Sequence, residues 1–138
     1  MRLKKQYLVV AMLMGVVAAI SVVATAASAH FVGARSCTQS GSNLVCNFKV
    51  AGLGNISQTS VTVQARFSCT KTTNGEQFVQ PGGLASSTQQ NVPVSNGQIT
   101  VTNFTIAGGR CPDAFSPTFT GQATVIVGGV TVGTIPIT

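Results

Sequence analysis

Few side chains of this sequence could carry out catalytic chemistry. The 138 residues include one histidine, His30, and two acidic residues, Glu76 and Asp113. Two carboxyl groups can hydrolyse a glycosidic bond when they lie about 5–10 Å apart, and a histidine with an aspartate can activate a serine. However, Glu76 adjoins a turn signal, Asp113 follows a proline in a loop, and no Gly-x-Ser-x-Gly motif occurs. We therefore expect solvated carboxyl groups and a protein that is not an enzyme.

The sequence also has few side chains that could bind a metal or a cofactor. An N-terminal His30 could bind copper through its amine and imidazole, but such a site needs a second histidine, which the chain does not have. Two carboxylates make a poor calcium cage. We expect no cofactor and no metal.

Four cysteines, Cys37, Cys46, Cys69 and Cys111, are spaced by 9, 23 and 42 residues. Zinc sites need close ligand pairs, and no Cys-x-x-Cys is present, whereas an even number in a small exported chain indicates two disulfides. Three pairings are open. We favour Cys37–Cys46 and Cys69–Cys111, because a turn-rich segment between the first two would place two strands side by side.

The first 29 residues have the features of an export signal. Arg2, Lys4 and Lys5 precede an apolar run from Leu8 to Val23, and Ala27-Ser28-Ala29 satisfies the small-x-small rule for cleavage. We expect a helix over residues 7–27, cleavage between Ala29 and His30, and a secreted domain of residues 30–138. The alternative is retention as a membrane anchor, since the uncharged stretch is about long enough to span a bilayer.

The charge remaining after cleavage is small. Five basic and two acidic side chains give a net charge of +3, which excludes a strongly basic nucleic-acid binder. Lys49 and Arg66 point outward by strand parity and would form a weak positive patch, attractive to anionic wall polymers, if their strands were neighbours. The chain lacks Trp, and Tyr7 lies in the leader, which disfavours a carbohydrate-binding module.

Hydrophobic alternation with a period of two residues predicts the strands. The clearest strand is Thr59–Cys69, and Leu44, Cys46, Phe48 and Val50 alternate in the same way. In Gln98–Ile106 the apolar parity switches, which predicts a β-bulge near Asn103. The remaining predicted strands are Phe31–Cys37, a short edge piece at Val92–Val94, Ala123–Val127 and Val130–Ile137.

Turn residues separate these strands. Asn74-Gly75, Asn96-Gly97 and Gly128-Gly129 predict tight turns. Ala51–Asn55 and Gly108–Pro117 are predicted loops. Thr70–Gln90 is predicted to be polar and irregular, with a further turn at Pro81-Gly82-Gly83.

About seven short strands and no helical periodicity in residues 30–138 predict an all-β fold. We expect an antiparallel, immunoglobulin-like β-sandwich, preceded by the signal-peptide helix. A small barrel is the alternative.

Several short segments suggest relatives. They are His30-Phe31-Val32, the run from Phe48 to Gly54, Gly97–Thr100 and Cys111-Pro112. Together they resemble uncharacterised small secreted proteins of actinobacteria and similar soil bacteria, which implies an exported all-β domain. Cys37…Cys46 and Val50-Ala51-Gly52 are also similar to segments of the enediyne-chromophore apoproteins, in a different order along the chain. No ligand residues are carried over from either group.

These observations predict a secreted, non-enzymatic module that binds an unknown extracellular or cell-envelope partner, with no nucleic acid and no membrane after cleavage. One alternative is a structural subunit that self-associates through uncharged strand edges at Ala123–Val127 and Val130–Ile137. The other is a small-molecule carrier, which would need a large apolar cleft.

Overall fold

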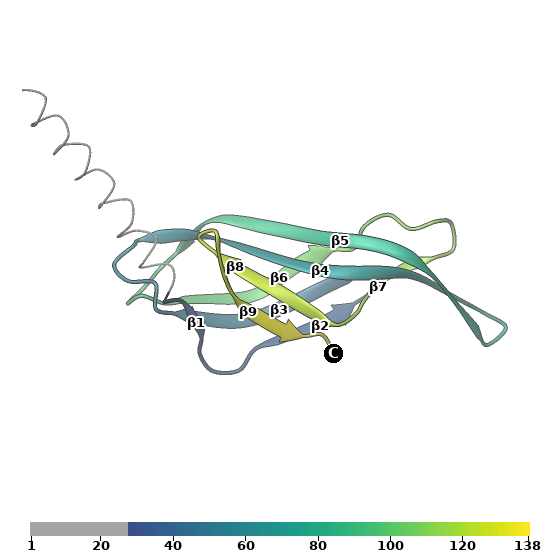
Figure 1. Cartoon of the computed structure of the whole chain (residues 1–138), viewed down its shortest axis with the longest axis horizontal. Helices are drawn as coiled ribbons and strands as arrows, with labels where there is room; N and C mark the ends of the chain where they lie inside the picture. The colour runs from purple at the N-terminus through teal and green to yellow at the C-terminus, as the bar shows by residue number, and fades with distance from the viewer. Residues whose placement is uncertain (1–27) are drawn as a thin grey trace, which may run out of the picture.

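The computed structural model describes residues 28–138, and these consist of strands, turns and loops (Figure 1). The strands are β1 (His30–Phe31), β2 (Ser36–Ser40), β3 (Asn43–Ala51), β4 (Gln58–Thr73), β5 (Glu76–Pro93), β6 (Ile99–Ala107), β7 (Ser116–Phe119), β8 (Gln122–Val127) and β9 (Val130–Pro136). The all-β prediction is confirmed for this part of the chain, in which no helix could cross a bilayer. The helix expected over residues 7–27 lies outside the described residues.

The strands form two antiparallel sheets. In sheet A, β1 and β2 lie in succession along one edge of β3, and β6 lies along its other edge. In sheet B, β5 lies along one edge of β4, and β7 and β8 lie in succession along the other, with β9 beyond β8. One hydrophobic core drawn from both sheets lies between them, so the fold is a β-sandwich.

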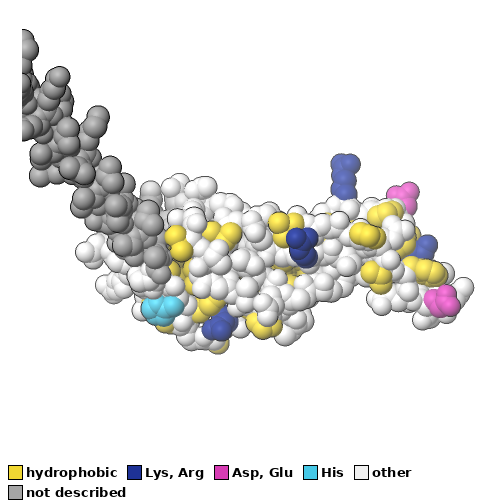
Figure 2. All heavy atoms as spheres, in the orientation of Figure 1, with side chains coloured by type: hydrophobic (Ala, Val, Ile, Leu, Met, Phe, Trp, Pro, Cys, Tyr) yellow, Lys and Arg dark blue, Asp and Glu magenta, His cyan; other side chains and the backbone are white. Residues whose placement is uncertain are grey.

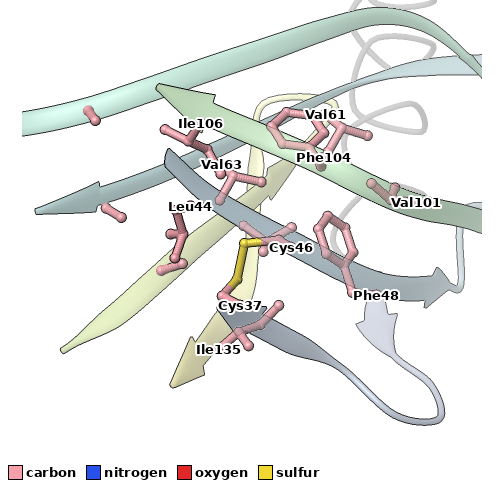
Figure 3. Close-up of a cluster of buried hydrophobic side chains, with 14 of the residues drawn as sticks. Cys37, Leu44, Cys46, Phe48, Val61, Val63, Val101, Phe104, Ile106 and Ile135 are labelled. Carbon is pink, nitrogen blue, oxygen red and sulfur yellow. A yellow bond between two sulfur atoms is a disulfide. The ribbon is translucent and has the colours of Figure 1, made fainter. Parts of the chain in front are cut away.

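Alternation along the strands builds this core as predicted. The inward row of β4 is buried and consists of Val61, Val63, Ala65, Phe67 and Cys69. The neighbouring β8 adds Ala123, Val125 and Val127 to this face of sheet B, and the facing row of sheet A on β3 consists of Leu44, Cys46, Phe48 and Val50. Figure 3 shows side chains of both sheets, including Leu44 and Val63, meeting in this layer. No polar or charged residue is buried among the described residues, so the core is apolar throughout.

The bulge predicted near Asn103 is present in β6. Cys46 pairs with Phe104 and Phe48 pairs with Val101, so two residues of β6 oppose Asn47 alone. Asn103 has a φ of 55°, and its backbone N–H donates to the side-chain oxygen of Asn47 at 2.9 Å. The extra residue returns Phe104 and Ile106 to the core face, where both are buried.

The three predicted tight turns are also found. Asn74-Gly75 joins β4 to β5, Asn96-Gly97 lies between Ser95 and Gln98, and Gly128-Gly129 joins β8 to β9. All six residues have positive φ values, from 54° to 83°. Asn and Gly tolerate this left-handed region, and two such residues in succession match the twist of a two-residue hairpin.

The prediction for Thr70–Gln90 is wrong. This segment belongs to one long hairpin, in which β4 pairs with β5 from Gln58 opposite Pro93 to Thr73 opposite Glu76. Pro81-Gly82-Gly83 is a bulge within β5, because Ser68 pairs with Pro81 and Phe67 with Gly83. β5 is mostly exposed, and Ala85 is its only buried residue between Glu76 and Gln90, so this segment shows no alternation that would reveal a strand.

The two disulfides of the structure are the two pairs favoured by the spacing. Cys37 and Cys46 are opposite each other on β2 and β3, and both are fully buried. Cys69 on β4 is bonded to Cys111, which ties the loop of residues 108–115 to sheet B.

One side of the sandwich is closed by β2 and the end of the chain. Ile137 forms a parallel bridge with Cys37, whose carbonyl accepts a hydrogen bond from Thr138 N at 3.0 Å. The Gln39 amide links β2 to β7, since it donates to Pro117 O at 2.7 Å and accepts from Phe119 N at 2.8 Å. The segment Ala123–Val127, for which an uncharged strand edge was predicted, belongs to β8. Because β8 lies between β4 and β9, this segment is an inner strand and not a free edge.

Candidate functional site

Beyond the end of sheet A, β4 and β5 continue as a slender hairpin, seen at the right of Figure 1. We call residues 70–80 the distal arm. None of its residues is buried, whereas the inward row of β4 up to Cys69 is buried throughout. The arm is therefore not needed to cover the core.

A cation between two aromatic rings lies on one face of this arm. Lys71 continues the inward row of β4 past Cys69 and pairs with Phe78 across the hairpin. Its ammonium nitrogen lies 6.0 Å from the ring centroid of Phe78 and 5.4 Å from that of Phe115 in the adjacent loop. Such contacts favour a cation over the face of a ring, so Lys71 connects the arm to the loop.

The loop is also held by close packing around Phe67. A Cβ atom on Gly109 would lie 2.4 Å from the tip of the Phe67 ring, and one on Gly82 would lie 2.2 Å from the Phe67 carbonyl oxygen. Only glycine fits at position 82 without a backbone shift, and a side chain at position 109 would displace the Phe67 ring. With the Cys69–Cys111 disulfide, this packing fixes the loop and the bulge of β5 at the base of the arm.

Large hydrophobic side chains are exposed on both faces of the arm. Phe78 is 45% exposed, and Val79, which points to the opposite face, is 61% exposed. We use the name distal patch for Lys71, Phe78 and Phe115 on one face of the arm together with Val79 on its other face. The sequence contained a signal for it, namely an apolar Phe-Val pair in a polar segment just after an Asn-Gly turn.

Charged side chains also gather at this end. Glu76 lies next to the arm's turn, and Arg110 and Asp113 lie in the disulfide-bonded loop. Figure 2 shows both acidic side chains at the same end, beside hydrophobic and cationic ones. The distal end thus combines aromatic, aliphatic and charged groups of both signs.

The ionisable residues considered for catalysis do not come together. His30 pairs with Ala51 at the end of β3, while the loop with Asp113 lies near the start of β3, where Gly108 N donates to Ser42 O at 3.1 Å. The imidazole Nδ1 of His30 lies 3.0 Å from Ser28 O. Within residues 28–138, no three metal-ligating side chains form a group.

The expected cleavage site lies beside a close backbone contact. Ala29 is half-buried against the core, and the Ser28 hydroxyl donates to Gly52 O at 2.9 Å. A Cβ on Gly52 would lie 2.3 Å from Ser28 O, so only glycine fits there. Cleavage between Ala29 and His30 stays a prediction.

The conditional positive patch of Lys49 and Arg66 does not form. Lys49 belongs to β3 in sheet A and Arg66 to β4 in sheet B, and the outward sides of the two sheets face in opposite directions. Arg35 is another cation near the start of sheet A. Its guanidinium carbon lies 4.9 Å from the ring centroid of Phe31.

The hollows found on residues 28–138 are open, and their linings mix polar and apolar groups. One of them, of about 580 Å³, lies at the end opposite the arm and is lined by glycines, polar residues, Ile56 and Val94. None of the hollows lined by Ile56, Lys49, Ser95 or Arg66 is a large apolar cleft of the kind that a small-molecule carrier would need.

Comparisons with family models, curated proteins and solved structures give no match for this chain.

Proposed function

We propose that this protein is a secreted, non-enzymatic module that binds a protein partner outside the cell through its distal patch. The observation that carries the proposal is the exposure of Phe78 and Val79 on an arm that covers no part of the core. Aromatic and aliphatic side chains among mixed charges have the composition of a protein-binding surface. A partner with a complementary apolar surface would gain by covering them.

The disulfides support the export that is part of this proposal. Disulfides persist in oxidising compartments, and this chain has two of them in a small domain. The proposal includes a leader helix that is removed before His30, and an immunoglobulin-like arrangement of the sandwich.

The non-enzymatic part of the proposal rests on the separation of the ionisable groups. His30 lies at one end of β3, whereas Glu76 and Asp113 belong to the distal end. An acid–base or nucleophilic mechanism needs such groups within hydrogen-bond reach of one substrate.

Self-association is the second candidate, and β5 favours it. This strand of 18 residues forms an outer edge of sheet B, and its one charged residue, Glu76, lies at its first position. A long uncharged edge presents backbone donors and acceptors to another strand.

The test compares binding of the exported protein and its variants to washed cell surfaces of the producing organism. Phe78→Ser combined with Val79→Ser should weaken binding by about tenfold or more, as loss of a central apolar contact does. The control is Ile56→Ser, which removes a hydrophobic side chain of 39% exposure at the other end. Prior protease treatment of the surfaces should abolish binding.

Equal binding by the double variant and the control would contradict the proposal. A concentration-dependent dimer in sedimentation experiments that persists in the double variant would favour assembly through β5 instead.

A further inference from the structure

A hollow lies on the outward face of sheet B, where β7 gives way to β8. β7 pairs with Phe67–Thr70 of β4 and β8 pairs with Val61–Gln64. Between these two paired stretches, residues 65 and 66 of β4 lie beside the turn at Thr120-Gly121. Thr120 N donates to Arg66 O at 3.3 Å, and Ile137 N donates to Gly121 O at 3.0 Å. The turn that borders the hollow is therefore held by hydrogen bonds to β4 on one side and to the end of the chain on the other.

The hollow has a volume of about 420 Å³, within the range of small-ligand sites. Its side chains comprise two amides, two hydroxyls, one guanidinium and one aliphatic group. They are Gln64, Gln122, Thr120, Thr124, Arg66 and Leu84. The register places Arg66 opposite Leu84 and Gln64 opposite Thr124, so these side chains share the outward face.

Each of these groups matches a part of an acidic sugar. A guanidinium presents paired N–H donors that fit a carboxylate. Amides and hydroxyls both donate and accept, as sugar hydroxyls require. The hollow has no Trp or Tyr platform of the kind that carbohydrate-binding modules present, and Leu84, which is 53% exposed beside Arg66, offers an apolar surface to the C–H face of a sugar ring in its place.

The charge around the hollow is also complementary to an anion. Arg66 is exposed, and the only acidic residues of the chain, Glu76 and Asp113, lie at the distal end (Figure 2). No carboxylate lines the hollow to compete for the guanidinium.

We propose that this hollow binds a carboxylate-bearing polysaccharide, with Arg66 binding the carboxylate and the amides and hydroxyls binding the sugar hydroxyls. The site is separate from the distal patch, so this inference does not depend on the proposed function. A protein with both surfaces could hold an acidic polymer with one and a protein partner with the other.

The test is affinity electrophoresis or calorimetry of the full exported protein with polygalacturonate, and with dextran as the neutral polymer. Arg66→Gln should lower the affinity for polygalacturonate by about tenfold, since a paired charged contact is lost. Lys49→Gln is the matched control, because it removes the same charge from the outward face of sheet A. The control should change the affinity less than about twofold.

Leu84→Ser should weaken binding by about threefold, because a partly exposed aliphatic contact is removed. The Phe78→Ser and Val79→Ser double variant should bind polygalacturonate like the wild type, which separates this site from the distal patch. Equal losses for Arg66→Gln and Lys49→Gln would indicate nonspecific charge attraction and overturn the proposal. Absence of wild-type binding to polygalacturonate, or equal binding to dextran, would overturn it as well.

Discussion

The same strand, β4, is buried along one half and exposed along the other. From Val61 to Cys69 its inward side chains are apolar and are covered by sheet A. From Lys71 onward the inward row becomes polar, and the strand is accompanied by β5 and the loop of residues 108–115. The change in side-chain type marks the point at which the second sheet ends. The sandwich body thus supplies stability, and the distal arm is free to present a surface.

The largest expected effect tests what holds the arm's base to the body. C69A together with C111A should lower the free energy of unfolding by about 4 kcal/mol, because the disulfide closes a long loop. Urea unfolding followed by circular dichroism measures this loss. A loss below about 1 kcal/mol would show that packing around Phe67 holds the loop without the disulfide.

A pair of leucines sharpens the contrast between buried and exposed strand positions. Leu44 is fully buried in the body, whereas Leu84 is 53% exposed on β5. Leu44→Ala should cost about 2–5 kcal/mol, since it removes core contacts and leaves a cavity. Leu84→Ala should cost less than about 0.5 kcal/mol. Similar losses in urea unfolding would mean that β5 contributes to the core more than its exposure indicates.

Two adjacent glycines provide the finest test, at the base of the arm. A Cβ on Gly82 would lie 2.2 Å from Phe67 O, whereas one on Gly83 would meet the Phe67 ring at an ordinary 3.7 Å. Gly82→Ala should therefore destabilise the protein by about 1–3 kcal/mol, because backbone must move. Gly83→Ala should change stability by less than about 1 kcal/mol. Thermal unfolding of both variants checks the difference, and equal melting temperatures would contradict the close contact.

Much of the body could be predicted from the sequence. The alternation in Thr59–Cys69 reflects one face buried in the core and one face turned to solvent. The switch of apolar parity after Val101 predicted the bulge at Asn103. The arm could not be predicted in the same way. Both faces of Glu76–Gln80 contact solvent, so no hydrophobic period distinguishes a strand there from an irregular loop.

The candidate surfaces depended on contacts between distant residues. Lys71 and Phe115 are 44 positions apart in the numbering and meet only because the loop returns to β4. The hollow at Arg66 exists because β7 and β8 share one edge of β4 and leave a gap between them. Lys49 and Arg66 have the same outward parity, but their strands belong to different sheets.

The sequence by itself determined the strand rows, the Asn-Gly and Gly-Gly turns, the bulge and the scarcity of ionisable groups. These follow from local properties, namely which face of a strand is apolar and which residues accept a positive φ. The tertiary structure alone decided which strands are neighbours, where sheet A ends, and hence which side chains share a surface. Backbone hydrogen bonding between strands is open to almost any sequence, so the choice of neighbours is made by the packing of the whole core.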